Sequence, residues 1–145
     1  MMSKVRTCAS CEAALVKILV VEDDLIILEF LSLFLESEGM DVVTATGGEE
    51  ALRVARTEHP NAVLCDLHMA RVSGLEVLHG LRQDPDMADT PFVMITADQS
   101  ADLRRRSIDL GASAFVVKPF NPDHLIDTLH KIAPGPRPLY RARTN

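Results

Sequence analysis

The chain has 145 residues, 47% of them hydrophobic and 25% charged, with no tryptophan and a formal net charge of −6. This composition is typical of one globular domain and excludes collagen-like and wholly disordered chains. Because no apolar run reaches the roughly 20 residues of a membrane span and no small-residue cleavage site follows the first one, we expect a cytoplasmic protein without a signal peptide.

From residue 17 onward, short apolar runs alternate with longer amphipathic ones. The short runs resemble strands buried on both faces. The longer runs have helical length and end at signals such as Gly39 and Gly111. Asn121 is the expected N-cap of the last helix, with Pro122 at its first position. In chain order, strands and helices are predicted alternately over residues 17–21, 24–39, 40–46, 47–60, 61–66, 74–84, 91–97, 100–111, 113–120 and 121–133.

Strict alternation of five strands with five helices predicts an α/β fold. The expected architecture is a doubly wound, five-stranded parallel sheet of the flavodoxin-like type, with strand order 2-1-3-4-5 and helices on both faces. In such sheets ligands bind beyond the carboxyl ends of the strands, near the first and third strands. The residues that end the strands are therefore the first candidates for a functional site.

Polar side chains end four of the five predicted strands. The first strand ends in Glu22 and Asp23, the third in Asp66, the fourth in Thr96 and the fifth in Lys118. Taken alone, each residue has an ordinary interpretation as a helix cap, a loop cap or a solvated charge. Together, three carboxylates at one sheet edge repel one another and raise one another's pKa, so a compensating positive charge is expected.

This set of residues suits phosphoryl chemistry. Lys118 supplies one positive charge, and oxygen ligands beside a phosphate favour Mg²⁺ as a second. A carboxylate can itself accept a phosphoryl group, while metal, ammonium and hydroxyl groups stabilise the transferred oxygens. We therefore predict Asp66, the central carboxylate, as the acceptor. Glu22 and Asp23 would hold the metal, and Lys118 and Thr96 would bind phosphoryl oxygens.

Over residues 17–133 the chain resembles the response-regulator receiver domain of two-component signalling. The resemblance lies in four separated motifs, "KILVVEDD", "VLCDLHMARVSGLEVL", "VMITA" and "GASAFVVKPF". It implies the same roles for Asp66, the acidic pair, the Thr96 switch hydroxyl and Lys118. It also implies that the backbone carbonyl of His68 is a metal ligand, that the Lys118–Pro119 bond is cis, and that Phe115 occupies an aromatic switch position. One departure is Ala70, where the family often has proline.

The resemblance also implies partners. The phosphoryl donor would be a phosphohistidine on a sensor histidine kinase or a histidine phosphotransfer protein. Apart from its own phosphotransfer and slow autodephosphorylation, the domain would not be an enzyme. Phosphorylation would switch the binding of a downstream protein target. Since no output domain follows residue 133, we expect a stand-alone receiver; a phosphorelay shuttle, a phosphate sink and an unphosphorylated scaffold are alternatives.

A hydrolase that passes through an aspartyl phosphate is a competing enzyme class. Such an enzyme needs a second carboxylate as general acid near its nucleophile, and usually a cap over the substrate. The position two residues after Asp66 is His68, and no insertion is long enough to form a cap. The sequence therefore disfavours a hydrolase.

The two ends of the chain differ from its body. Residues 1–16 form an N-terminal extension with two basic residues and one acidic one, and residues 134–145 form a basic, Pro-rich tail with three arginines. The 117 residues between them carry a net charge of −10, which disfavours nucleic acid as a partner. We expect no membrane partner, and a disordered tail.

Two short sequence features invite special functions. The "CASC" motif places Cys8 and Cys11 at a redox or metal spacing, but no second pair of ligands completes a zinc site, so we interpret it as part of the extension. The three arginines of "LRRR", residues 103–106, indicate a solvated helix face or a partner surface rather than a nucleic-acid site.

The first helix is apolar nearly all round. The predicted core stripe consists of Ile27, Phe30, Leu31, Phe34 and Leu35, and the remaining apolar residues are Leu25, Ile26, Leu28 and Leu33. A helix of this kind is usually buried. The alternatives are surface residues partly covered by the N-terminal extension, and an interface for a kinase helix bundle or a homodimer.

Overall fold

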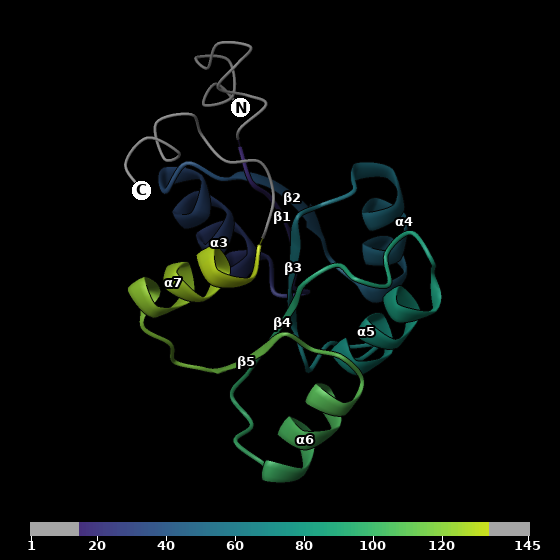
Figure 1. Cartoon of the computed structure of the whole chain (residues 1–145). Helices are drawn as coiled ribbons and strands as arrows, with labels where there is room; N and C mark the ends of the chain where they lie inside the picture. Colours follow the sequence, from purple (N-terminus) through teal and green to yellow (C-terminus); the bar gives the residue numbers. More distant parts are fainter. Residues whose placement is uncertain (1–14, 134–145) are drawn as a thin grey trace.

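The computed structural model describes residues 15–133, so the predicted N-terminal extension, its "CASC" motif and the basic tail lie outside the described residues. Strands and helices alternate along this part of the chain (Figure 1). The elements are β1 (Lys17–Val21), α3 (Leu25–Ser37), β2 (Asp41–Ala45), α4 (Gly48–Glu58), β3 (Ala62–Asp66), α5 (Gly74–Gln83), β4 (Phe92–Thr96), α6 (Ala101–Asp109), β5 (Ala114–Val117) and α7 (Pro122–Ile132).

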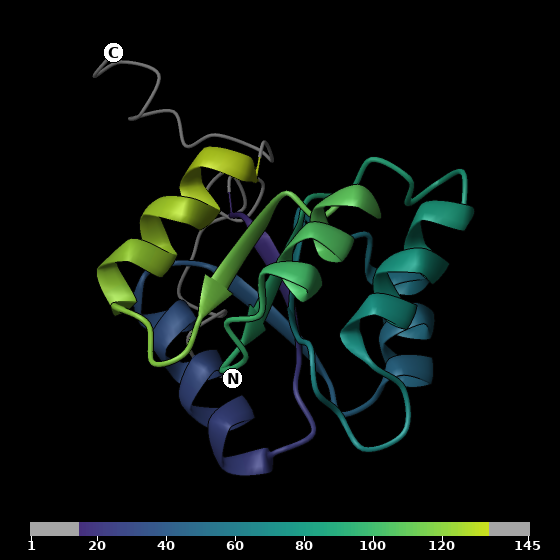
Figure 2. The same ribbon diagram turned by 90° about the horizontal axis from the view of Figure 1, so that it is seen from below.

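The five strands form one parallel sheet in the order β2-β1-β3-β4-β5, which confirms the predicted fold class and strand order. Helices α3 and α7 cover one face, and α4, α5 and α6 cover the other (Figures 1 and 2). Because β1 and β3 are neighbours in the middle of the sheet, with Val21 opposite Cys65, the residues that follow them meet at one edge.

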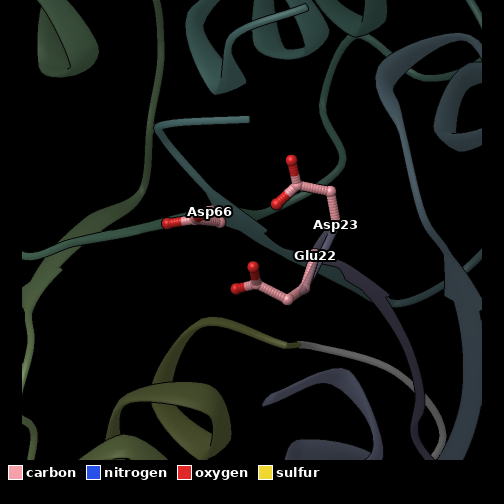
Figure 3. Close-up of side chains that lie close together, drawn as sticks. All are labelled: Glu22, Asp23 and Asp66. Carbon is pink, nitrogen blue, oxygen red and sulfur yellow. The ribbon is translucent and has the colours of Figure 1, made fainter. Parts of the chain in front are cut away.

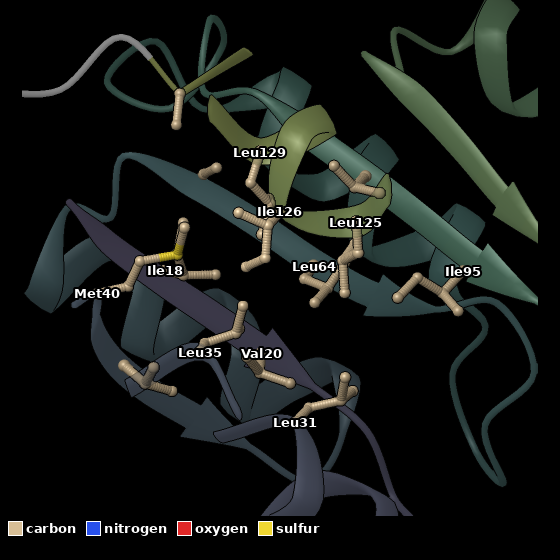
Figure 4. Packing of buried hydrophobic residues seen from close by; sticks show 14 of the residues in the cluster. Ile18, Val20, Leu31, Leu35, Met40, Leu64, Ile95, Leu125, Ile126 and Leu129 are labelled. Carbon is tan, nitrogen blue, oxygen red and sulfur yellow. The ribbon is translucent and has the colours of Figure 1, made fainter. Parts of the chain in front are cut away.

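An apolar cluster fills the space on each side of the sheet. Alternate residues of β1 point to opposite sides, so Ile18 and Val20 belong to the cluster under α3 and α7, while Leu19 and Val21 belong to the other. Figure 4 shows Val20, Leu35 and Leu129 within the first cluster. Burial of the strands on both faces explains why they are continuous apolar runs in the sequence.

Helix boundaries follow local capping chemistry. The Asp24 carboxylate accepts hydrogen bonds from the backbone N–H groups of Ile26 and Ile27 at the start of α3. Asn121 caps α7, with Pro122 at its first position, as predicted. The positive φ at Gly39, 90°, follows the end of α3 and suits glycine because it has no Cβ. No helix among residues 15–133 is long and apolar enough to cross a membrane.

One part of the predicted α3 stripe is wrong. Phe30 is 55% exposed, whereas Leu28, predicted to lie outside the stripe, is 8% exposed and belongs to the core. The buried residues Leu28, Leu31 and Leu35 are spaced by three and four positions and face the sheet. Ile27 and Phe34 are partly buried and pack against the same cluster. Phe30 instead stacks on the partly buried Phe34, with ring centroids 6.4 Å apart.

Gly74, the first residue of α5, allows this helix to approach the end of β3 closely. A Cβ atom at Gly74 would lie 2.7 Å from the backbone oxygen of Asp66 and 2.7 Å from the sulfur of Met94. We therefore expect Gly74→Ala to push α5 away from β3 and to lower the free energy of unfolding by about 1–3 kcal/mol. Urea unfolding measures this loss.

Gly80→Ala, in the same helix, is the matched control. Its Cβ would meet the end of the flexible Leu52 side chain at 3.0 Å rather than backbone, and alanine favours the helix by roughly 1 kcal/mol over glycine. This variant should be as stable as the wild type or more so. Equal losses in the two variants would contradict the close-approach argument.

Candidate functional site

Three carboxylates gather where β1 and β3 end. Glu22 and Asp23 directly follow β1, and Asp66 is the last residue of β3. Each offers one oxygen, and these oxygens all lie within 4.8 Å of one another (Figure 3). Glu22 is 3% exposed and Asp66 8% exposed, while Asp23 is exposed. Together they form a cluster of hard oxygen ligands with one open side, which suits a divalent cation such as Mg²⁺.

Backbone N–H groups fix the two residues that follow β1. The N–H of Asp24 donates to Glu22 Oε2 at 3.1 Å, and the N–H of Ala70 donates to Asp23 Oδ2 at 2.8 Å. The second bond connects the loop after β1 with the loop after β3. The sequence does not indicate this role of Ala70, because a backbone donor leaves no signature in the residue type.

Lys118 lies against two of the three carboxylates. Its Nζ atom is 3.2 Å from Asp66 Oδ1 and 3.5 Å from Glu22 Oε1. The lysine follows β5, and its backbone N–H donates to the carbonyl oxygen of Thr96 at 2.7 Å. The Lys118–Pro119 bond is cis, as the resemblance implied. The expected compensating charge is therefore present in the cluster.

Burial and charge raise the pKa of Glu22. Loss of hydration is the largest cause, and the negative charges of Asp66 and Asp23 act in the same direction. The hydrogen bond from the Asp24 N–H and the charge of Lys118 oppose this rise only in part. The predicted repulsion between carboxylates therefore contributes, but less than burial does.

Cys65 directly precedes Asp66, the candidate acceptor, but its thiol is unreactive. Its side chain is fully buried, and loss of hydration raises the pKa of the thiol well above its usual range. The nearby charges of Asp66 and Glu22 add to this rise. Because the thiolate is the reactive form of cysteine, Cys65 serves as a small apolar residue of the core.

The remaining predicted residues lie around the cluster at different depths. Thr96 ends β4 and is fully buried, and its Oγ1 accepts a hydrogen bond from the N–H of Asp98 at 3.0 Å. Phe115 is partly buried in β5. His68 is exposed, and its Nε2 atom lies 3.5 Å from a carboxylate oxygen of Asp98. The metal-ligand role of the His68 carbonyl stays a prediction.

The arginine run of α6 has one member with a specific contact. All three arginines are exposed, as expected for a solvated face. The guanidinium carbon of Arg104, however, lies 5.7 Å from the ring centroid of Phe115, within the range of a cation–π interaction. Arg104 therefore connects α6 with the predicted aromatic switch position, a contact that composition alone does not indicate.

A cleft of about 350 Å³ opens beside Asp23. The loop after β2 and the first turn of α4 line it through residues 46–50, and the loop after β3 lines it through residues 69–72. The open side of the carboxylate cluster therefore adjoins a space that solvent or a small ligand can enter.

Comparison with known proteins identifies the family. The model of the response regulator receiver domain matches residues 18–130. The chain belongs to this family. As a receiver domain it is a phosphoacceptor signalling domain, and the shuttle, sink and scaffold alternatives are not favoured.

Individual relatives agree with this assignment. The receiver domain is 41% identical over 106 residues to the alkaline phosphatase synthesis transcriptional regulatory protein PhoP of Bacillus subtilis, an alignment that covers 73% of this chain and 43% of PhoP. It is 42% identical over 109 residues to the probable transcriptional regulator ycf27 of Cyanophora paradoxa, covering 75% and 44%. The chain thus spans less than half the length of these curated relatives.

A solved structure gives the same result. The chemotaxis protein CheY4 of Vibrio cholerae superimposes with a TM-score of 0.79 at 32% sequence identity, covering 82% of this chain and 99% of CheY4. The shared architecture extends over the whole of that receiver.

The raised pKa of Glu22 makes stability depend on pH and metal. In the window between the ordinary pKa of 4.5 and the raised value, the folded state holds a proton that the unfolded chain has lost. The stabilisation that this extra proton gives to the folded state is fully present below pH 4.5 and is lost as pH rises through the raised pKa of Glu22. At neutral pH the metal-free receiver domain therefore carries the cost of a buried charge. We expect Glu22→Gln to stabilise the metal-free fold at neutral pH. Below pH 4.5, where the wild-type carboxyl is protonated, the substitution should change stability little.

Urea unfolding with a chelator across this pH range measures the difference, and Glu29→Gln, at an exposed position on α3, is the control. We expect Mg²⁺ to stabilise the wild type more than Glu22→Gln, because the acidic cluster of the variant has one negative charge fewer and should bind a divalent cation at least about tenfold more weakly. A Glu22→Gln variant no more stable than the wild type at neutral pH would contradict the conclusion that the charged Glu22 carboxylate destabilises the metal-free fold.

Proposed function

We propose that Asp66 accepts a phosphoryl group from a phosphohistidine, with Mg²⁺ held by Glu22, Asp23, Asp66 and the backbone carbonyl of His68. One observation carries the proposal. The Asp66 carboxylate lies both within the cluster of three acidic oxygens and 3.2 Å from the Lys118 ammonium. A nucleophile beside a cation site and a fixed ammonium is the arrangement that phosphoryl transfer requires.

In the proposed reaction a carboxylate oxygen of Asp66 forms a bond to phosphorus as the phosphorus–nitrogen bond of the donor breaks. The electron pair of that bond stays on the imidazole nitrogen, and the histidine leaves as neutral imidazole because its other ring nitrogen already carries a proton. The buried β3 strand fixes the position of Asp66, which favours in-line attack. Bound Mg²⁺ would neutralise charge on the phosphoryl oxygens.

Lys118 and Thr96 would bind the transferred group. Once the Asp66 oxygen carries phosphorus, the Lys118 ammonium can pair with a phosphoryl oxygen instead of the free carboxylate. The Thr96 hydroxyl already accepts one hydrogen bond from Asp98, which leaves its own proton free to donate. The hydroxyl of Thr96 would donate a hydrogen bond through that proton to a nearby phosphoryl oxygen.

A chain of short contacts leads from Thr96 to α6. Asp98 donates to Thr96 through its N–H and accepts from the N–H of Ser100 at 2.9 Å, and Ser100 is the N-cap of α6. A shift of the Thr96 hydroxyl toward the phosphate would therefore pull the start of α6. The contact between Arg104 and Phe115 would carry the change to β5. We infer that α6 and β5 present the switched surface to a downstream protein.

The partners follow from this chemistry. The donor would be a sensor histidine kinase or a histidine phosphotransfer protein. The acidic surface of this domain disfavours nucleic acid as its own ligand, although the relatives are transcriptional regulators by name. We place the protein in the cytoplasm, in keeping with the free thiol of Cys65.

Hydrogen exchange after phosphorylation tests the proposed switch. Phosphoramidate, which has the same phosphorus–nitrogen bond as phosphohistidine, serves as donor with Mg²⁺. Amide exchange in residues 97–117 should change in the wild type and stay unchanged in Asp66→Asn. A phosphorylated protein with no exchange difference in this segment would contradict the switch and favour a phosphate sink.

A further inference from the structure

Helix α3 has an apolar surface that the rest of the described chain leaves open. Among residues 15–133 the exposed large apolar side chains are five, and four of them lie on α3: Leu25 at 66%, Ile26 at 81%, Phe30 at 55% and Leu33 at 59%. Positions 26, 30 and 33 follow helical spacing and form one row. We call these four residues the α3 apolar face. A contiguous face of this kind commonly marks an interaction site.

The charge around this face specifies its occupant. Residues 18–52 contain nine acidic residues and no lysine or arginine. Two of the acids, Glu29 and Glu36, lie on α3 itself, and Glu29 is exposed. A second copy of the same face would bring glutamates of equal charge together. A basic segment with apolar side chains is the complementary ligand.

The chain itself contains such a segment. Residues 134–145 hold Arg137, Arg141 and Arg143, with no acidic residue, and place Leu139 and Tyr140 between the arginines. The N-terminal extension is less complementary, since it has two basic residues and carries Glu12. Charge and apolar content therefore both favour the C-terminal segment.

The described part of the chain ends at Ala133, near the end of α3. Helices α3 and α7 cover the same face of the sheet and share one core cluster (Figures 1 and 4). Both helices connect to parallel strands and run in the opposite direction to them, so they end at the same sheet edge. Ala133, the C-cap of α7, is buried in the cluster that includes Leu35 of α3. The chain leaves α7 from that position.

The segment is long enough to run along the whole helix. Twelve residues in an extended, proline-type conformation span about 37 Å, whereas the 13 residues of α3 span about 20 Å. Counted from Ala133, Arg137 can reach about 12 Å and Arg143 about 31 Å. Arg137 can therefore reach the last turns of α3 near Glu36, and Arg143 can reach its first turn.

We propose that residues 137–143 bind the α3 apolar face of the same molecule. Leu139 and Tyr140 cover Phe30 and Leu33, and the arginines pair with the glutamates of α3. The first turn of α3 follows Asp24, whose N–H binds the Glu22 carboxylate, so the bound segment ends beside the carboxylate cluster. This contact is independent of whether Asp66 accepts a phosphoryl group.

A spin label in the tail tests the proposal in the full chain. The label is placed at Ala142→Cys after Cys8→Ser and Cys11→Ser, since the buried Cys65 does not react. Amide signals of residues 25–33 should lose intensity, and those of α6 should not. The loss should disappear when Arg137, Arg141 and Arg143 are replaced by glutamate, at positions outside the described residues.

Two matched substitutions test whether the tail binds the α3 apolar face specifically or any exposed apolar residue. Leu33→Glu should remove the intensity loss, and Ile108→Glu, at the 46% exposed position on α6, should preserve it. When spin-labelled protein without isotope enrichment is mixed with isotope-enriched protein that carries no spin label, the amide signals of the enriched protein should lose no intensity. Intensity loss in that mixture would assign the face to a second copy. No loss in the labelled chain, or loss on another face, would overturn the proposal.

Discussion

Asp66→Asn is expected to take up no phosphoryl group from any donor. The amide has the shape of the carboxylate but lacks its nucleophilic charge, so the oxygen that would attack phosphorus is lost. The variant should remain folded, because it removes one of three crowded carboxylates while Lys118 keeps Glu22 as a partner at 3.5 Å. Intact mass after incubation with phosphoramidate and Mg²⁺ measures uptake.

Asp98→Asn is the matched control for this result. Asp98 lies in the next loop, 3.5 Å from His68, and is not part of the carboxylate cluster. It should still gain one phosphoryl group. Equal uptake by Asp66→Asn and the wild type would assign the phosphoryl group to another residue and contradict the proposed transfer to Asp66.

Lys118→Met should slow phosphorylation by about 100-fold or more, since a fixed positive charge on the transferred group is lost. Methionine keeps the length of the side chain and removes the ammonium. The same change leaves Glu22 and Asp66 without their nearest positive charge. We therefore expect lower stability in the presence of a chelator, by about 1–3 kcal/mol after allowance for the solvent around the lysine.

Mg²⁺ separates the two roles of Lys118. The metal should restore much of the stability of Lys118→Met, because it neutralises the same carboxylates, but it should not restore the rate. Lys17→Met is the matched control, because Lys17 forms a 2.9 Å ion pair with Glu58 and lies at the start of β1, away from the cluster. A Lys118 variant that is phosphorylated as fast as Lys17→Met would refute the role assigned to the ammonium.

The fold followed from the sequence because both faces of the sheet are covered. Strands such as β3, in which all five residues are buried, are continuous apolar runs in the sequence, and their alternation with helices leaves few topologies. The cluster of Glu22, Asp23, Asp66 and Lys118 followed as well, because parallel strands bring their carboxyl ends to one edge. These residues are brought together by topology rather than by local sequence.

The features that the sequence did not predict depend on tertiary packing. Phe30 and Leu28 were assigned to the wrong sides of α3 because apolar residues surround its few polar positions, so the sequence does not show which part of the apolar surface faces the sheet. The bond from the Ala70 N–H to Asp23 joins residues 47 positions apart through a backbone group. The contact of Arg104 with Phe115 depends on how α6 packs over β5.

Intact mass of the wild-type protein, with phosphoramidate and with Mg²⁺ either present or chelated, tests whether Asp66 is a metal-dependent phosphoacceptor. We expect a gain of one phosphoryl group that requires the metal, and fragmentation should locate the group on Asp66. No gain in either condition, or a gain on a residue outside the cluster of Glu22, Asp23 and Asp66, would contradict it.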